Sequence, residues 1–381
     1  MTLEIPILVP WTPGFVGAAK TVYRDLEKLG VRPVLLCPAD RFESTVKAGF
    51  NCLKVEDSKA FSMSLWATVE TTLSQFHTLA ALIKDRGWFT LVTTQFNPVH
   101  TLLKSVCDVR TLIIGTAAPL FPIEDQMAPK NERHRRQKWR QDQWCWISER
   151  ASMAAGLSGS VSLDELWGDA FLLRSVPELD DDDTKTRKNV VHAGSMLWDA
   201  LDGEAAPSAG AHDVDLCYFQ HGRHFERSSA WEILSAVLKT TDLEVILDLE
   251  RYDGTSKPEA SSRVHLVEKP NFYAYAEALK LMVTSGGSTS VLYALERGVP
   301  QIITQKASGS EDLVESLQAR DLCYFADAAN VSATFLSSEL RDTMENQVEA
   351  IARHDLPDSF GKARTERPAQ IGKILREFGV L

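Results

Sequence analysis

A run of glycines and hydroxyl side chains joins an apolar segment to a helical one near residue 285. The run reads Ser-Gly-Gly-Ser-Thr-Ser over 285–290 and follows the apolar residues 281–284. Glycine lets the backbone approach a ligand closely and adopt a positive φ, and the first turn of a helix has unsatisfied N–H groups and a partial positive charge. A phosphate would suit this turn. The alternative is that Ser288 or Thr289 only caps the helix.

The elements that would position this turn alternate along the chain. Apolar strands are expected at 5–10, 31–37, 89–94, 110–116, 215–220, 243–249, 263–268, 281–285 and 300–304. Helices are expected between them, for example at 18–29, 66–86, 98–107, 228–239, 272–279 and 289–297. This order indicates parallel βαβ units. The sequence therefore predicts an α/β fold with two Rossmann-like, doubly wound parallel-sheet domains facing a cleft.

Length and composition limit the classes of protein to which the chain can belong. A chain of 381 residues favours two domains, and the composition of 185–212 predicts a linker. The net charge of −11 argues against a nucleic-acid partner. The six cysteines show no CxxC, which predicts free thiols in a reducing cytoplasm. We find no signal-peptide pattern and no apolar run long enough for a transmembrane segment, so a cytoplasmic protein is predicted.

The neighbours of the glycine turn give it a context. Upstream lie Gln220-His221-Gly222-Arg223 and Glu268-Lys269-Pro270-Asn271, and downstream lie Gly298-Val299-Pro300 and Glu311-Asp312. This arrangement resembles the donor-binding half of GT-B glycosyltransferases, the nucleotide-sugar enzymes of the family-1, macrolide and peptidoglycan types. The resemblance continues as a weaker pattern into the N-terminal half, from residue 9 to residue 55.

The resemblance implies a role for each part of the chain. Residues 1–190 would bind the acceptor, 191–360 would bind the donor, and 361–381 would form a helix packing back on the first domain. The donor diphosphate would be bound by Gly222, Arg223, Ser285, Gly286, Gly287, Ser288, Thr289 and Ser290. The base, ribose and sugar would be held by Val267, Lys269, Asn271, Tyr293, Glu311 and Asp312. The acceptor loop would contain Thr12, Gly14 and Phe15. Neither a cofactor nor a metal is expected.

The sequence departs from the family at the catalytic dyad. Inverting members usually carry a general-base His in the first loop and an Asp after a later strand, but here Phe15 follows Gly14 and the later strand ends in Thr-Thr-Gln. In the donor site, Ser285 replaces a His and Tyr293 replaces the Glu that holds the ribose. Three accounts stay open. Another residue, such as His100, Glu124 or Asp125, could act as the base, the acceptor could need no strong base, or the protein could bind a donor without turning it over. For His100, the alternative is a structural role.

Residues 128–150 are rich in Lys, Arg and Trp, although the chain as a whole is acidic. On a helix, one face would carry Arg133, Arg136, Arg140 and Trp144. An anionic or aromatic acceptor, or an anionic membrane surface, would suit that face. The alternative is a solvated helix whose arginines extend over packed tryptophans. The run Asp180–Asp183 predicts a solvated loop.

Together, these patterns predict an inverting glycosyltransferase. It would move a hexosyl group from a UDP- or dTDP-sugar to a small-molecule acceptor, for example a natural product. One alternative is a sugar-nucleotide 2-epimerase or hydrolase of the same fold. Another is a noncatalytic nucleotide-sugar-binding partner, which the missing dyad suggests.

Overall fold

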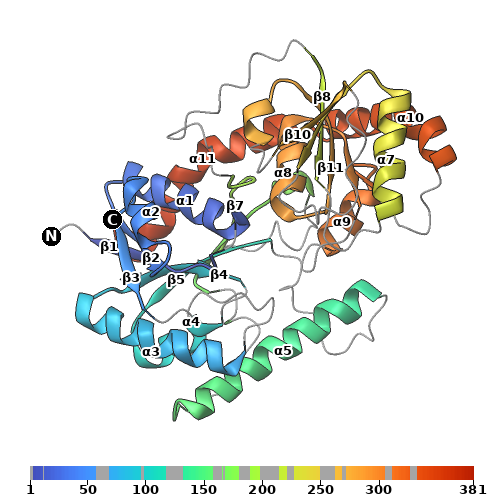
Figure 1. The fold of residues 1–381 in the computed structure, drawn as a ribbon. Coiled ribbons are helices and arrows are strands. Elements are labelled where there is room, and N and C mark those ends of the chain that lie inside the picture. The colour runs from blue at the N-terminus through green and yellow to red at the C-terminus, as the bar shows by residue number, and fades with distance from the viewer. Residues whose placement is uncertain are drawn as a thin grey trace. The chain divides into compact units, whose positions relative to one another are not determined.

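The computed structural model describes residues 3–11, 13–56, 68–95, 98–116, 132–157, 165, 168–179, 189–197, 214–220, 227–248, 262–267, 272–304, 311–326 and 333–381. The chain divides into two compact units (Figure 1). Unit 1 contains Met1–Trp198 and Lys362–Leu381, and unit 2 contains Asp199–Gly361.

A seven-stranded parallel sheet forms the centre of unit 1, with the strand order β3-β2-β1-β4-β5-β6-β7. Its strands are β1 (Glu4–Ile7), β2 (Arg32–Pro38), β3 (Cys52–Val55), β4 (Thr90–Thr94), β5 (Arg110–Gly115), β6 (Ala170–Leu173) and β7 (Val190–His192). Its helices are α1 (Pro13–Lys28), α2 (Phe42–Lys47), α3 (Val69–Arg86), α4 (Val99–Val106) and α5 (Glu132–Ala154), followed by a 3₁₀ turn at Pro177–Leu179.

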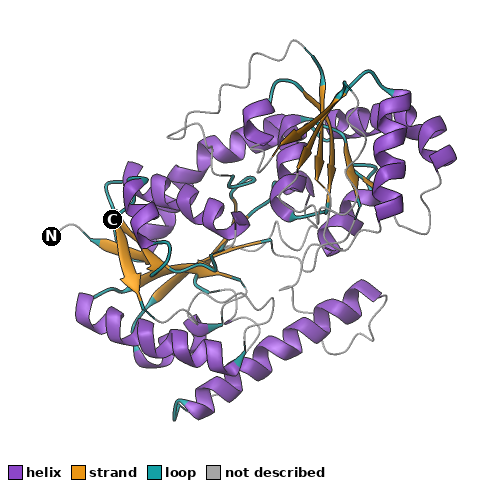
Figure 2. Cartoon of the chain, in the orientation of Figure 1, coloured by secondary structure: helices purple, strands orange, loops and turns teal. Residues whose placement is uncertain are grey.

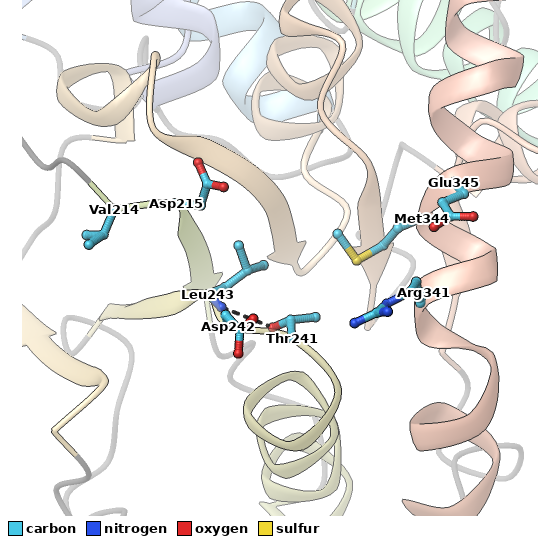
Figure 3. A pocket seen from close by; sticks show the side chains of 8 residues that line it. All are labelled: Val214, Asp215, Thr241, Asp242, Leu243, Arg341, Met344 and Glu345. Carbon is cyan, nitrogen blue, oxygen red and sulfur yellow. Dashed lines mark hydrogen bonds between the residues drawn. The ribbon is translucent and has the colours of Figure 1, made fainter.

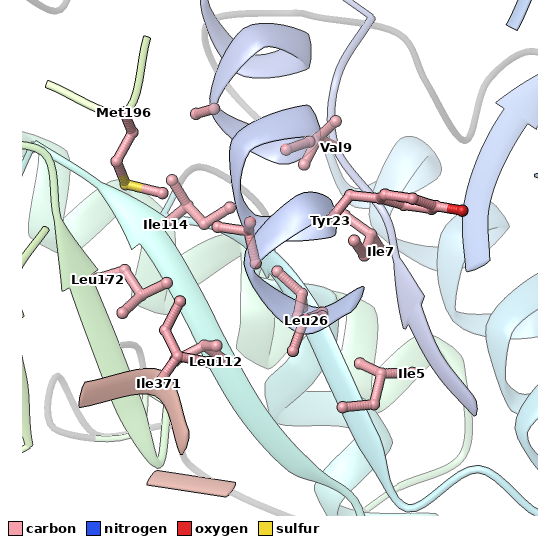
Figure 4. Packing of buried hydrophobic residues seen from close by; sticks show 14 of the residues in the cluster. Ile5, Ile7, Val9, Tyr23, Leu26, Leu112, Ile114, Leu172, Met196 and Ile371 are labelled. Atoms are coloured by element: carbon pink, nitrogen blue, oxygen red, sulfur yellow. The ribbon is translucent and has the colours of Figure 1, made fainter. Parts of the chain in front are cut away.

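Both faces of this sheet are buried in a hydrophobic core. Successive side chains of a strand point to opposite faces, so each strand contributes to both cores. In β2, Leu35 and Cys37 join a core with α1, whereas Leu36 joins a second core with α3 and α4. The first core also contains Ile371 of the C-terminal helix α11 (Leu356–Glu377) (Figure 4). The strands therefore read as continuous apolar runs, as parallel sheets covered on both faces do.

Local signals fix where several helices begin and end. Pro13 opens α1, where its missing N–H costs no helical hydrogen bond. Thr68 and Thr71 form a capping box at the start of α3. Gly87 ends α3 in the left-handed conformation, at φ 65°.

Unit 2 has a six-stranded parallel sheet with the order β10-β9-β8-β11-β12-β13. Figure 2 shows the strands in orange and the helices in purple. Its strands are β8 (Leu216–Gln220), β9 (Glu244–Asp248), β10 (Val264–Val267), β11 (Leu279–Thr284), β12 (Gln301–Ile303) and β13 (Tyr324–Phe325). Its helices are α7 (Arg227–Thr240), α8 (Ser288–Arg297), α9 (Glu311–Gln318) and α10 (Ala333–Arg353). Side chains of α7 and α10 pack with alternate residues of β8, β9 and β11 in one core.

Helix α11 begins in unit 2 and ends in unit 1. In unit 1, the guanidinium of Arg367 donates to the Asp25 carboxylate of α1 at 2.5 Å and to the carbonyl oxygen of Ala193 at 3.1 Å. Arg367 and Asp25 are both buried. The end of the chain is therefore fixed to α1 and to the segment after β7 by a buried ion pair.

Two expectations about the elements differ from the structure. Residues 272–279 were expected to form a helix, but only Phe272–Tyr275 form a 3₁₀ turn and β11 already begins at Leu279. The break in the α/β pattern after residue 119 contains α5 and β6. All six cysteines are free thiols, as predicted. Among the described residues, no helix is long and apolar enough to cross a membrane.

Candidate functional site

The strand order of unit 2 reverses between β8 and β11. From β8 the chain continues through β9 to β10 on one side, and from β11 it continues through β12 to β13 on the other. The two central strands are neighbours, with Phe219 opposite Val283. In open α/β sheets, ligands bind beyond the carboxyl ends of the strands at such a switch point. Gln220 and Thr284 are the last residues of β8 and β11.

The predicted glycine turn occupies this position. It follows Thr284, and Gly286 adopts the left-handed conformation at φ 71° while its N–H lies 3.4 Å from the Thr284 Oγ1. Gly287 is the N-cap of α8, with extended backbone and no side-chain cap. The interpretation that Ser288 or Thr289 caps the helix is therefore wrong.

The described residues leave space for a side chain at Gly287. Among the described residues, a Cβ added there would meet only the Ser290 Oγ, at 3.8 Å, and this hydroxyl donates to the Gly287 carbonyl oxygen at 2.9 Å. Ser285 and Ser290 are largely buried, whereas Ser288 and Thr289 are half-buried. The N-cap of α8 is therefore a glycine that makes no side-chain cap bond, and the partial positive charge at a helix start suits an anion.

A buried carboxylate, which the sequence interpretation missed, lies at the ends of β8 and β9. Asp248 is 4% exposed, and its Oδ2 accepts hydrogen bonds from the Tyr218 hydroxyl at 3.2 Å and the Gln220 Nε2 at 3.4 Å. The hydrogen bond to Asp248 fixes the side chain of Gln220, the residue at which the predicted diphosphate turn begins. The only sequence signal was an acidic residue closing an apolar strand.

The residues predicted to bind the base, ribose and sugar differ in how deeply they are buried. Val267 ends β10 and is half-buried, and Glu311 is half-buried in the first turn of α9. Asp312 beside it is buried. Tyr293 is 2% exposed, and its ring meets that of Tyr273 edge to face at 4.9 Å. The buried hydroxyl of Tyr293 favours a packing role over contact with a ribose.

Several predicted site residues lie outside the described residues. They are Thr12, Asp125, Gly222, Arg223, Lys269 and Asn271. Glu124 and the run Asp180–Asp183 lie outside them as well. Within the described part of the chain, no group of three or more His, Cys, Asp or Glu side chains could hold a metal ion.

Unit 1 has its own switch point, between β1 and β4. Gly14 and Phe15 lie in the first turn of α1, after β1, and both are half-buried. Gln95 follows β4, where the family usually has an Asp. Its Oε1 accepts from the Thr116 N–H at 2.6 Å, and its Nε2 donates to the Thr116 Oγ1 at 3.2 Å.

His100, the first residue named as a possible base, is buried in α4 at 1% exposure. Its Nε2 lies 2.9 Å from the carbonyl oxygen of Glu165. A general base must come within hydrogen-bond reach of the proton that it removes. This imidazole is poorly placed for that role, and its burial favours a structural one.

The face of α5 predicted to carry arginines and a tryptophan points into the protein. Arg140 is 5% exposed and Trp144 is 1% exposed, and Arg136 is half-buried. Helix α5 packs against α3 and α4. Trp144 is packed, as the alternative expected, but Arg140 is buried with it, so the expectation that the arginines of this face are solvated is wrong for Arg140. Arg133 has no described side chain.

A pocket of 530 Å³ lies elsewhere in unit 2 (Figure 3). It is lined by Val214, Asp215, Thr241, Asp242, Leu243, Arg341, Met344 and Glu345. Residues 214–215 and 241–243 directly precede β8 and β9, so this pocket is at the amino ends of the strands. It lies at the opposite edge of the sheet from the glycine turn.

No protein-family model and no curated protein sequence matches the chain. Solved structures match it over nearly its whole length. The calicheamicin glycosyltransferase has a TM-score of 0.72 at 10% identity, covering 99% of this chain and 98% of its own. The glycotransferase of kitacinnamycin has 0.71 at 14%, covering 99% of both chains.

A third match is the spinosyn rhamnosyltransferase complexed with thymidine diphosphate. Its TM-score is 0.69 at 14% identity, covering 98% of this chain and 100% of its own. At such low identities the likeness concerns the fold, and the two parallel sheets agree with it. The chain therefore has the GT-B fold, as the resemblance in its sequence predicted.

Proposed function

We propose that the protein is a glycosyltransferase that moves a hexosyl group from a UDP- or dTDP-sugar to a small-molecule acceptor. The observation that carries the proposal is the glycine turn at the switch point between β8 and β11, with Gly286 at φ 71° and the uncapped start of α8 behind it. The comparisons support the two substrate classes. The spinosyn rhamnosyltransferase has been solved with thymidine diphosphate and with the spinosyn aglycone.

In the proposed reaction, the acceptor hydroxyl oxygen attacks the anomeric carbon while the bond from that carbon to the diphosphate oxygen breaks. A single displacement of this kind inverts the configuration. Negative charge develops on the leaving diphosphate, and the backbone N–H groups of Ser288 and Thr289 would stabilise it without reorganising. Arg223 would add a charge-assisted contact.

The acceptor hydroxyl must lose its proton during attack. Of the candidate bases His100, Glu124 and Asp125, His100 is buried against a backbone carbonyl, so we propose the acidic candidate Asp125, with Glu124 beside it as the other. Changing Asp125 to Asn should lower turnover and leave donor affinity unchanged. Changing His100 to Gln should mainly lower the midpoint temperature of unfolding. Equal turnover of wild-type protein and the Asp125 variant would remove Asp125 as the base.

The function is tested by incubating the protein with UDP- and dTDP-sugars, with and without acceptor extracts. We expect nucleoside diphosphate to be released only when an acceptor is present, together with a glycosylated product. Epimerisation of the donor without acceptor would refute the transferase and support the 2-epimerase.

A noncatalytic partner is the second candidate. The observation in its favour is that Phe15 and Gln95 stand where a catalytic His and Asp are usual, and that the Gln95 amide is bonded to Thr116. Tight donor binding without turnover for any acceptor would support this candidate and refute the transferase.

A further inference from the structure

Gln220, the last residue of β8, carries an amide whose two ends have different surroundings. Its Nε2 donates to the Asp248 Oδ2 at 3.4 Å. Among the described residues, none donates a hydrogen bond to its Oε1, and the side chain is only half-buried. An amide oxygen accepts hydrogen bonds and cannot donate them. Gln220 therefore offers an accessible acceptor at the carboxyl edge of the sheet of unit 2.

Asp248 determines which end of this amide is turned inward. Gln220 and Asp248 lie opposite each other on the parallel strands β8 and β9. The same Oδ2 also accepts from the Tyr218 hydroxyl at 3.2 Å, and Tyr218 and Asp248 are both buried. An ionised carboxylate only accepts hydrogen bonds. The amide must therefore direct its N–H end to Asp248, which leaves its oxygen for another partner.

The Gln220 side chain lies on the face of the sheet that α8 covers. Cys217 and Phe219 belong to the core with α7 and α10, so Tyr218 and Gln220 face the other way. Helix α7 leads from β8 to β9 and α8 leads from β11 to β12, in opposite directions across the sheet. Because such crossovers are right-handed, the two helices cover opposite faces. Figure 1 shows α7 in yellow and α8 in orange on either side of the strands.

Gln220 is also level with the end of β11. Phe219 pairs with Val283, so Gln220 and Thr284 end neighbouring strands, which lie about 4.8 Å apart. Thr284 leads directly into the glycine turn. The amide oxygen carries a partial negative charge and the Asp248 carboxylate beside the amide adds a full one, so this position repels a phosphate and attracts the hydrogen of a hydroxyl group.

We propose that Gln220 is a donor-binding residue whose Oε1 accepts a hydrogen bond from a hydroxyl group of the nucleotide sugar, and that Asp248 is the residue that positions it. The inference rests on the proposed function, because it requires a nucleotide sugar at the glycine turn. The hydroxyl group belongs to the ribose or to the transferred sugar, and the two cases differ in which ligands are affected when Gln220 is changed.

The first test measures the affinity of the full chain for UDP, UDP-glucose, dTDP and dTDP-glucose by isothermal titration. Gln220→Leu keeps a side chain of similar size and removes both polar ends. We expect it to weaken binding roughly 2- to 12-fold, as the loss of one neutral hydrogen bond does. An equal loss for nucleotide and nucleotide sugar assigns the hydroxyl group to the ribose, and a loss for the nucleotide sugars alone assigns it to the sugar.

Two negative results have different meanings. Wild-type protein that binds at least one of these ligands, together with a Gln220→Leu variant of unchanged affinity, would overturn the role of Gln220 and leave the proposed function standing. Wild-type protein that binds none of the four would refute the proposed function, and the role of Gln220 with it.

A double-mutant cycle tests the positioning role of Asp248. Asp248→Asn keeps the shape of the side chain but adds an N–H group, which lets the Gln220 amide turn its oxygen inward. It should weaken donor binding roughly 2- to 12-fold in the wild-type background and no further in the Gln220→Leu background. Additive effects of the two changes would overturn the claim that Asp248 acts through Gln220.

Tyr218→Phe is the matched control, because it removes the other hydrogen bond to the same Asp248 oxygen. It should lower the midpoint of urea unfolding and leave donor affinity unchanged. If Tyr218→Phe weakened donor binding as much as Asp248→Asn does, the effect of Asp248 would be structural and its positioning role would be overturned.

Discussion

Replacing Gly287 tests the proposed diphosphate site more directly than any other change, because the structure separates its effect on folding from its effect on binding. Gly287 has φ −63° and ψ 135°, which any residue adopts, and in the part of the chain that the structure describes an added Cβ meets only the Ser290 Oγ, at 3.8 Å. A less flexible unfolded chain would stabilise the alanine variant by about 0.4–1 kcal/mol. The weaker preference for alanine at an N-cap acts in the opposite direction. The free energy of unfolding should therefore change by less than about 1 kcal/mol.

Binding should change much more. The added Cβ would occupy the space through which a diphosphate approaches the first N–H groups of α8. One hydrogen bond to a charged group contributes about 1.5–3 kcal/mol, so losing one weakens donor affinity roughly 10- to 150-fold. Isothermal titration with UDP and dTDP measures the affinity, and denaturant unfolding measures the stability. Gly287→Val should abolish detectable binding.

The matched control is Gly361→Ala, in the interior of α11. A Cβ there meets no atom of the described residues within 4 Å, so the variant should be stabilised by about 0.4–1 kcal/mol and bind donor like wild-type protein. A folded Gly287→Ala protein with unchanged donor affinity would refute the placement of the diphosphate. A loss of binding that accompanied a large loss of stability would refute the claim that the turn has room for a side chain.

Three further predictions concern stability. Arg367→Met should lower the free energy of unfolding by about 3–5 kcal/mol in denaturant titrations, because it leaves the buried carboxylate of Asp25 without its cation; adding Asp25→Asn should recover part of the loss. Burial would raise the pKa of Asp169, but the Lys104 ammonium at 2.9 Å and further hydrogen bonds hold it below its usual value. Since the folded-state pKa is the lower one, this carboxylate stabilises the fold above about pH 4 and the stabilisation is lost as the pH falls further; Asp169→Asn should flatten that acid limb, and an unchanged limb would contradict the assignment. Gly115→Ala should lower the midpoint temperature of unfolding, since its Cβ would overlap side chains of the adjoining strands, at a cost of about 1–3 kcal/mol.

The strands and the glycine turn were predictable because their signals are local. A buried parallel strand needs a continuous apolar run, and a tight turn before a helix needs glycine, so both can be read within a few residues. The turn at 285–290 lies where its sequence placed it, with Gly286 at φ 71°. The order of the strands, and hence the switch point between β8 and β11, comes from the structure, because pairing between distant strands leaves no such local signal.

The side chains that face a ligand were less predictable, because burial depends on contacts between distant segments. His100 follows a strand end, but the carbonyl of Glu165, 65 residues later, takes up its Nε2. Tyr293 lies one turn into α8, and its ring packs on Tyr273 from another element. In α5, Arg140 of the predicted face is buried and Arg136 is half-buried, because the long apolar parts of arginine side chains can line a packed interface.

The two units differ in how far their structures support the proposed chemistry. In unit 2, the features that support the proposed diphosphate site belong to the backbone: a positive φ at Gly286, a helix start with glycine at its N-cap and a switch point between β8 and β11. None of them depends on the His or Glu that the resemblance led us to expect at positions 285 and 293. In unit 1, the missing features are side chains, and a backbone cannot supply a proton acceptor. Gln95 has no negative charge with which to orient and polarise a base, and its amide is already bonded at both ends to Thr116. Donor binding is therefore the better-supported half of the proposed function, and the identity of the proton acceptor determines whether binding leads to transfer.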